Sequence, residues 1–157
     1  MIFDLVKSTD PLLKTKLDKF NFDNPPTNPI ELAISLAETM IHNNGIGLAA
    51  NQVGLPYRVF VLMAEEILVC FNPIIVDTTS EEIYLEEGCL SFPGMLVKVK
   101  RPKSIKIRFT DADRKVYTKS FTGMTARAVL HELDHLDGIT FKDRATTYHW
   151  QQAKKNK

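Results

Sequence analysis

The 157-residue sequence lacks long apolar segments and has only two cysteines. No hydrophobic run approaches the ~20 residues that a membrane-spanning helix needs. Asp4 and Lys7 interrupt the first apolar stretch, so we expect no secretory signal. Two cysteines cannot form a disulfide framework, which favours a reduced, cytoplasmic protein. The net charge of +1 argues against nucleic-acid binding through bulk positive charge, and we expect no sequence-specific nucleic-acid binding and no membrane partner.

Repeats, low-complexity tracts and glycine- or serine-rich linkers are also absent. The composition, 44% hydrophobic and 25% charged, is typical of a folded globular protein. A chain of this length commonly forms one domain with its own core. We therefore expect residues 1–157 to form a single domain and the protein to be a monomer.

Two segments have the pattern of amphipathic helices. A helix is expected at 29–43, because Asn28 can cap it and apolar residues recur from Ile30 to Ile41 at helical spacing, which predicts that this face is buried. Gly45 is well placed for a left-handed residue at its end. A second helix is expected at about 124–136, before a glycine.

Between these helices the pattern changes to that of β-strands. Apolar runs and apolar residues that alternate with lysines predict strands at 59–63, 67–71, 97–99, 105–109 and 115–121. A short helix is possible around 11–17, and the positive charges of the polar tail 148–157 are expected to be solvated. The predicted fold class is therefore α+β with antiparallel strands.

The second helix contains the string His131-Glu132-Leu133-Asp134-His135. Histidines at positions i and i+4 project from one face of a helix, where they can bind one metal ion. Glu132 borders that face, where a carboxylate can reach a reacting water molecule without being a metal ligand. The apolar residues of this helix lie on the opposite side, which predicts one buried side and one catalytic side. Such a string also occurs by chance in unrelated helices.

A catalytic metal of this kind has three protein ligands. His42 and His149 are candidates for the third, although each stands among polar residues, as structural or exposed histidines do. Cys89 is more informative, because the glycines, carboxylates and proline around it indicate an irregular backbone that can present a thiolate. The residues alone support Cys89 equally as a ligand and as a buried filler, whereas Cys70, inside an apolar strand, is interpreted as a core residue.

The segment Gly45–Gln52 joins the first helix to the strand at 59–63. Its small residues allow the backbone to approach another group closely, and Gln52 offers an amide donor. A phosphate-binding loop is a poor fit, because such loops open a helix after a strand and usually contain lysine. A tightly packed connection is the alternative.

These three segments together resemble the signature of the peptide deformylase family. The sequence reads GIGLAANQ at 45–52, EGCLS at 87–91 and HELDH at 131–135, in the order and rough spacing of that family. The resemblance covers roughly residues 8–144. It implies antiparallel sheets around a central helix that carries the HELDH metal motif. It also implies hydrolytic removal of the N-formyl group from the N-terminal formylmethionine of newly synthesised polypeptides, with release of formate.

The resemblance also implies roles for individual residues. The metal, commonly ferrous iron in the family and in other cases zinc, nickel or cobalt, is bound by Cys89, His131 and His135. Glu132 acts as general base and then as acid, while Gln52 and the backbone N–H of Leu90 stabilise the oxyanion. The hypothesised substrate pocket is formed by Ile46, Gly47, Leu85, Glu87, Gly88, Met124 and Ala128.

Two features depart from the family pattern. Leu130 precedes the HELDH string, where many members have glutamine, so a supporting contact there is in doubt. About 19 residues follow Gly138, whereas many bacterial members have a longer C-terminal helix implicated in ribosome docking. The expected partners are formylmethionyl nascent polypeptides and the ribosome, with docking through such a helix in doubt.

Two other functions are compatible with parts of the sequence. One is a metal hydrolase that acts on a different amide, and the other is a non-catalytic module that binds a metal or a peptide. A binding module needs neither Glu132 nor Gln52, so the presence of both favours an enzyme.

Overall fold

The computed structural model describes residues 1–157. The strands are β1 (Gly47–Ala49), β2 (Val59–Met63), β3 (Ile67–Thr78), β4 (Glu82–Glu87), β5 (Val97–Pro102), β6 (Ser104–Thr110) and β7 (Val116–Thr122). The helices are α1 (Pro29–His42), α2 (Gly123–Leu136), α3 (Phe141–Arg144) and α4 (Thr147–Lys155), with 3-10 turns η1 (Pro11–Lys14) and η2 (Ala50–Val53). None of the helices is both long and apolar enough to cross a membrane.

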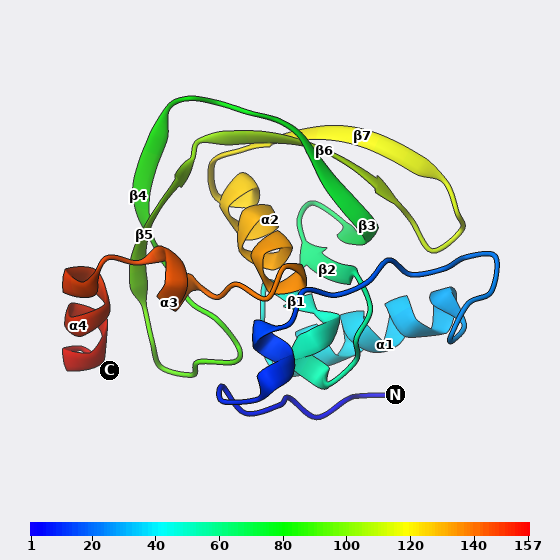
Figure 1. Ribbon diagram of the computed structural model, residues 1–157, viewed down its shortest axis with the longest axis horizontal. Coiled ribbons are helices and arrows are strands. Elements are labelled where there is room, and N and C mark those ends of the chain that lie inside the picture. The colour runs from blue at the N-terminus through cyan, green and yellow to red at the C-terminus, as the bar shows by residue number, and fades with distance from the viewer.

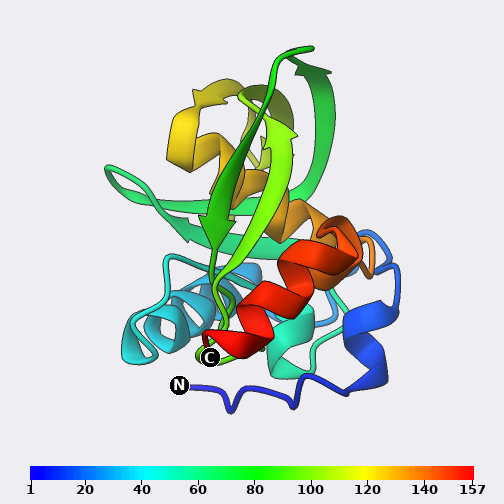
Figure 2. The same cartoon turned by 90° about the vertical axis from the view of Figure 1, so that its left-hand side faces the viewer.

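Helix α2 lies between two antiparallel sheets (Figure 1). The larger sheet has the strand order β1-β2-β3-β6-β7, and the smaller sheet pairs β4 with β5. Figure 2 shows the same arrangement from the side of the smaller sheet, with α4 in front of it. The predicted α+β fold, with antiparallel sheets around the helix that carries the HELDH string, is confirmed.

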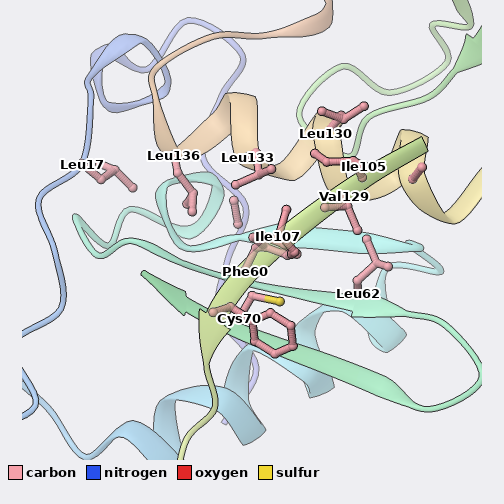
Figure 3. Packing of buried hydrophobic residues seen from close by; sticks show 13 residues of the cluster. Leu17, Phe60, Leu62, Cys70, Ile105, Ile107, Val129, Leu130, Leu133 and Leu136 are labelled. Carbon is pink, nitrogen blue, oxygen red and sulfur yellow. The ribbon is translucent and has the colours of Figure 1, made fainter. Parts of the chain in front are cut away.

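The larger sheet is covered on both faces by helices near β2. Phe60 and Leu62 belong to the core under α2, whereas Val59 and Val61 belong to the core under α1, as the alternation of a strand requires. Figure 3 shows the apolar side of α2 packed on this sheet, with Cys70 among the buried residues. The interpretation of Cys70 as a core residue is confirmed by its complete burial. This packing fixes the rotation of α2 and therefore the direction of its polar side.

The buried face of α1 is rotated from the predicted one and shares Ala33 and Met40 with it. Asn28 caps the helix as predicted, through bonds from the Ile30 and Glu31 amides to its side chain. However, Leu32 and Leu36 are buried, whereas Ile30 and Ile34 are about half exposed. The sequence has apolar residues on two adjoining stripes of this helix, and packing against the sheet selects the stripe that contains the leucines.

The end of α1 also differs from the prediction. Asn44, with φ +55°, is the left-handed residue there, and Gly45 is not. Asparagine tolerates this conformation better than most residues. Gly45 instead lies against the side chain of Leu90, since a Cβ at Gly45 would be 2.6 Å from Leu90 Cδ1.

The sequence did not predict β1, η2, β4, α3 or α4. The lysines of the tail are exposed as expected, but α4 itself is docked: Thr146 accepts a bond from the His149 amide at the first turn, and Ala153 is buried. Trp150 packs edge-on against Phe141 next to the smaller sheet. A few apolar residues in a polar segment were therefore enough to dock a helix, and the composition of the tail did not indicate this.

Gly138 ends α2 in a crowded, left-handed position. Its φ is +74°, and a Cβ there would lie 2.6 Å from the carbonyl carbon of Lys14. We expect Gly138→Ala to lower the free energy of unfolding by about 3 kcal/mol, because it combines backbone strain with a backbone clash. Gly123→Ala is the matched control, with φ +62° but no atom within 4 Å of its Cβ, and should lose only about 1–2 kcal/mol. Urea denaturation measures both, and equal losses would show that the contact with Lys14 is unimportant.

Candidate metal centre and active site

Three residues of the HELDH string point away from the apolar core of α2. His131, Glu132 and His135 are all buried, with His135 completely so. Because the two histidines are four residues apart, their rings lie on one side of the helix, with centroids 4.9 Å apart. The loop after β4 brings Cys89 to the same side.

The donor atoms of Cys89, His131 and His135 converge on one point. All three lie within 4.8 Å of one another. The Cys89 Sγ is 3.4 Å from His135 Nε2, and the two Nε2 atoms are 3.2 Å apart. The structure therefore brings together the three residues that the sequence suggested as metal ligands.

This donor set fits a divalent metal ion. Two nitrogens at the edge of a tetrahedral site lie about 3.3 Å apart, and a nitrogen and a sulfur about 3.6 Å apart, close to the observed distances. Burial would lower the pKa of His131, but hydrogen bonds with Cys89 and Glu87 raise it to about 10, so this point attracts positive charge. Burial and the charge of His131 hold the pKa of His135 well below its usual value, which keeps a lone pair available on that ring.

Glu87 fixes the orientation of His131. Its Oε1 lies 2.9 Å from His131 Nδ1, so Nδ1 donates to the carboxylate and Nε2 points to the convergence point. Arg101 and Arg127 also donate to this carboxylate. Burial would raise the pKa of Glu87, but hydrogen bonds from His131 and Arg101 and the charge of these groups lower it to about 2. Glu87 therefore supports His131, a candidate metal ligand, in addition to lining the cavity as predicted.

A second carboxylate extends this ionic network. Asp134 Oδ2 accepts from Arg101 Nη1 at 2.8 Å, and both Asp134 oxygens accept from Arg144 on α3. Arg127 also donates to the carbonyl of Val99 at 2.7 Å. These arginines could not be inferred from the sequence, because residues so far apart in the chain give no local signal. Asp134, the aspartate inside the HELDH string, was the one sequence feature that indicated a buried basic partner.

Glu132 lies against the backbone of Gly47. A Cβ at Gly47 would be 2.5 Å from Glu132 Oε2, so a glycine is needed for this approach. Glu132 Oε1 is buried and has no hydrogen-bond partner within the protein. Burial raises the pKa of Glu132 to about 7 despite the opposing charge of His131, which suits a group that both accepts and donates a proton near neutrality.

The side-chain amide of Gln52 is held at both ends. Its Oε1 accepts from the Ala49 amide at 2.9 Å, and its Nε2 donates to Ser91 Oγ at 3.0 Å. Nε2 also lies 3.6 Å from Cys89 Sγ. Because Oε1 is occupied, the amide hydrogens must face the loop that carries Cys89. Leu90, the next residue of that loop, makes no backbone hydrogen bond through its N–H.

A cavity of about 490 Å³ opens over these groups. Of the predicted substrate-binding residues, the lining includes Ile46, Gly47, Glu87, Gly88, Met124 and Ala128. Leu85 lies outside the lining, which includes only the last two residues of β4, Glu86 and Glu87. The lining also contains residues that sequence reasoning missed, among them Phe92, Met95, Leu96 and Arg127.

The remaining candidates do not reach this site. His42 is exposed at the end of α1, and His149 packs against the ring of Tyr84, so neither belongs to the metal group. Leu130, at the position that departs from the family pattern, is buried in the core under α2.

Comparison with known proteins agrees with this site. The family model described as polypeptide deformylase matches residues 2–150. The chain belongs to the polypeptide deformylase family. Among curated relatives, the peptide deformylase of Desulforudis audaxviator is 40% identical over 93% of this chain and 95% of its own length. That of Dictyoglomus thermophilum is 42% identical over 92% of this chain and 94% of its own length.

Solved structures of this family share the fold. Peptide deformylase from Thermotoga maritima superimposes with a TM-score of 0.88 at 32% identity, over 93% of this chain and 99% of that one. Peptide deformylase from Legionella pneumophila superimposes with a TM-score of 0.90 at 28% identity, over 99% of this chain and 93% of that one. These are hydrolases of a metal-dependent family, so the chain is an enzyme of that class with a Cys89, His131 and His135 candidate metal site.

Proposed function

We propose that this enzyme removes the formyl group from the N-terminal formylmethionine of newly synthesised polypeptides, by hydrolysis, with release of formate. The observation that carries the proposal is the convergence of the Cys89 thiol and two imidazoles beside Glu132, at the bottom of an open cavity. Family membership supports the same reaction.

Glu132 is the proposed general base and acid. A bound divalent cation supplies Lewis-acid chemistry, which polarises a carbonyl and lowers the pKa of water. Glu132 takes a proton from the attacking water, whose oxygen bonds to the formyl carbon. The C–N bond then breaks, and Glu132 returns the proton to the departing methionine nitrogen. A pKa near 7 suits both steps.

Gln52 and the Leu90 backbone are the proposed donors to the oxyanion. Ala49 and Ser91 hold the Gln52 amide, and the second Nε2 hydrogen, which faces Cys89 at 3.6 Å, is the one available to the formyl oxygen as charge develops on it. The free N–H of Leu90 is available as a second donor. One donor of this kind can contribute about 10²–10³ in rate.

We propose ferrous iron as the physiological metal, with zinc, nickel or cobalt as alternatives. One thiolate with two imidazoles is a softer donor set than three nitrogens, which suits iron(II) as well as zinc. Cys89 is half-buried at the cavity and is therefore accessible to small oxidants. Its oxidation would release the metal.

Formate release from a formyl-Met peptide tests this function. The enzyme is reconstituted anaerobically with iron(II) and compared with a metal-free sample and with an acetyl-Met peptide. We expect formate from the formyl peptide alone and only with metal. Formate no higher than in the metal-free sample would refute the proposal, and equal acetate release would indicate a broader amide hydrolase.

A further inference from the structure

The two candidate histidine ligands have unequal support. His131 Nδ1 donates to the buried carboxylate of Glu87, whereas His135 Nδ1 is buried and has no hydrogen-bond partner within the protein. The orientation of a ligating histidine is normally fixed by a group that bonds to its second nitrogen. His135 therefore has to be held in place through another part of the residue.

Asn51 holds the backbone of His135. Its Nδ2 donates to the His135 carbonyl oxygen at 2.6 Å and to the Leu12 carbonyl oxygen at 3.3 Å. Both partners are acceptors, so the nitrogen end of the amide is the one that faces them. Asn51 is completely buried, and a hydrogen bond away from water is electrostatically stronger than one at the surface. The contact therefore restrains the backbone at the residue that carries the ligand.

These bonds are not required to satisfy the two carbonyl groups. The His135 carbonyl also accepts from the Gly138 amide at 3.1 Å, and the Leu12 carbonyl accepts from the Thr15 amide at 3.1 Å. Asn51 Oδ1, in contrast, is buried without a partner, which costs free energy. The folded state therefore gains little stability from an asparagine here, and what the side chain supplies is a fixed distance between η2 and the end of α2.

The 3-10 turn η2 reaches two of the three candidate ligands through consecutive residues. Gln52 donates to Ser91 and lies 3.6 Å from Cys89 Sγ. Asn51 contacts His135, whose Nε2 is 3.4 Å from the same sulfur. We propose that Asn51 is a positioning residue, which fixes the His135 imidazole relative to the Cys89 thiol for metal binding. This proposal rests on the proposed function, because it assigns a support to one ligand of the catalytic metal.

Metal binding by Asn51→Leu tests this proposal. Leucine has a branched shape similar to that of asparagine but no hydrogen-bond donor. The cobalt(II)-substituted enzyme and variant are titrated anaerobically with a chelator, and the cobalt dissociation constant and visible absorption spectrum are recorded. We expect the dissociation constant to rise about 10-fold, at the low end for a residue that supports a ligand, because the bond acts through the backbone. The ligand-field bands should also shift, since the two donors change their relative positions.

Thr39→Val is the matched control. Thr39 is completely buried on α1, and its hydroxyl accepts from the Phe3 amide and donates to the Ser35 carbonyl, so the variant also loses side-chain bonds to the backbone. Thr39 lies outside the cavity lining and the metal group. The variant should therefore keep the cobalt affinity and spectrum of the unmodified enzyme.

An unchanged dissociation constant and spectrum in Asn51→Leu would overturn the proposal. An equal loss of affinity in Thr39→Val would also overturn it, since the loss would then follow from stability in general. If Asn51→Leu does not fold, Asn51→Ala is used with the same expectation. Absence of formate from the unmodified, iron-loaded enzyme would instead refute the proposed function, and it is a separate result because cobalt affinity is measured without substrate.

Discussion

Glu132→Gln is expected to lower kcat by about 10²–10⁴-fold while the metal stays bound. The amide has nearly the shape of the carboxylate, so the fit against Gly47 is retained. It cannot accept the proton of the attacking water, however. Glu132 is not one of the three converging donors, so metal content should be unchanged. Formate release measures the rate, and elemental analysis measures the metal.

Glu66→Gln is the control for this experiment, since Glu66 is exposed in the turn between β2 and β3. It should behave like the unmodified enzyme. Loss of metal from Glu132→Gln would show that Glu132 supports the site structurally. Full activity with metal bound would remove Glu132 from the mechanism.

Glu87→Ala is expected to destabilise the protein by about 3–5 kcal/mol. The side chains of Glu87, Arg101 and Arg127 are each no more than 4% exposed, so the substitution leaves two buried guanidinium groups without their shared carboxylate. His131 Nδ1 also loses its acceptor. The free energy of unfolding from urea titration, together with the affinity for the metal, measures both effects.

Glu82→Ala provides the comparison on the same strand. Glu82 is exposed on β4 and makes no ion pair within 4 Å, so its removal should change stability by less than about 0.5 kcal/mol. A similar small effect for Glu87→Ala would mean that water compensates the buried arginines. Stability lost without any loss of metal affinity would separate the network from the orientation of His131.

Local sequence patterns predicted the elements whose residues interact with near neighbours. Helix α2 follows from periodicity, strands β2 and β3 begin where the apolar runs predicted them, and the two histidines share a face because they are four residues apart. The Asn28 cap is equally local. In contrast, α1 has apolar residues on two stripes, and only contact with the sheet decides which is buried.

The residues of the site also divide into those indicated by sequence motifs and those brought together only by packing. Sequence motifs indicated Cys89, Gln52 and the histidines, because their types and spacing carry the chemistry. The support of His131 by Glu87, and of Glu87 by Arg101 and Arg127, joins residues from β4, β5 and α2. No local pattern indicates which of the chain's 20 basic residues becomes buried beside a carboxylate.

The sequence by itself determined the α+β class, the HELDH helix and the family resemblance, since these depend on residue type and local spacing, and the resemblance implied the candidate metal donors. Only the tertiary structure decided the buried face of α1, the docking of α4, the exclusion of Leu85 from the cavity and the contact of Asn51 with His135. These depend on which surfaces meet when distant segments pack, and the free energy of that packing involves residues from several elements at once.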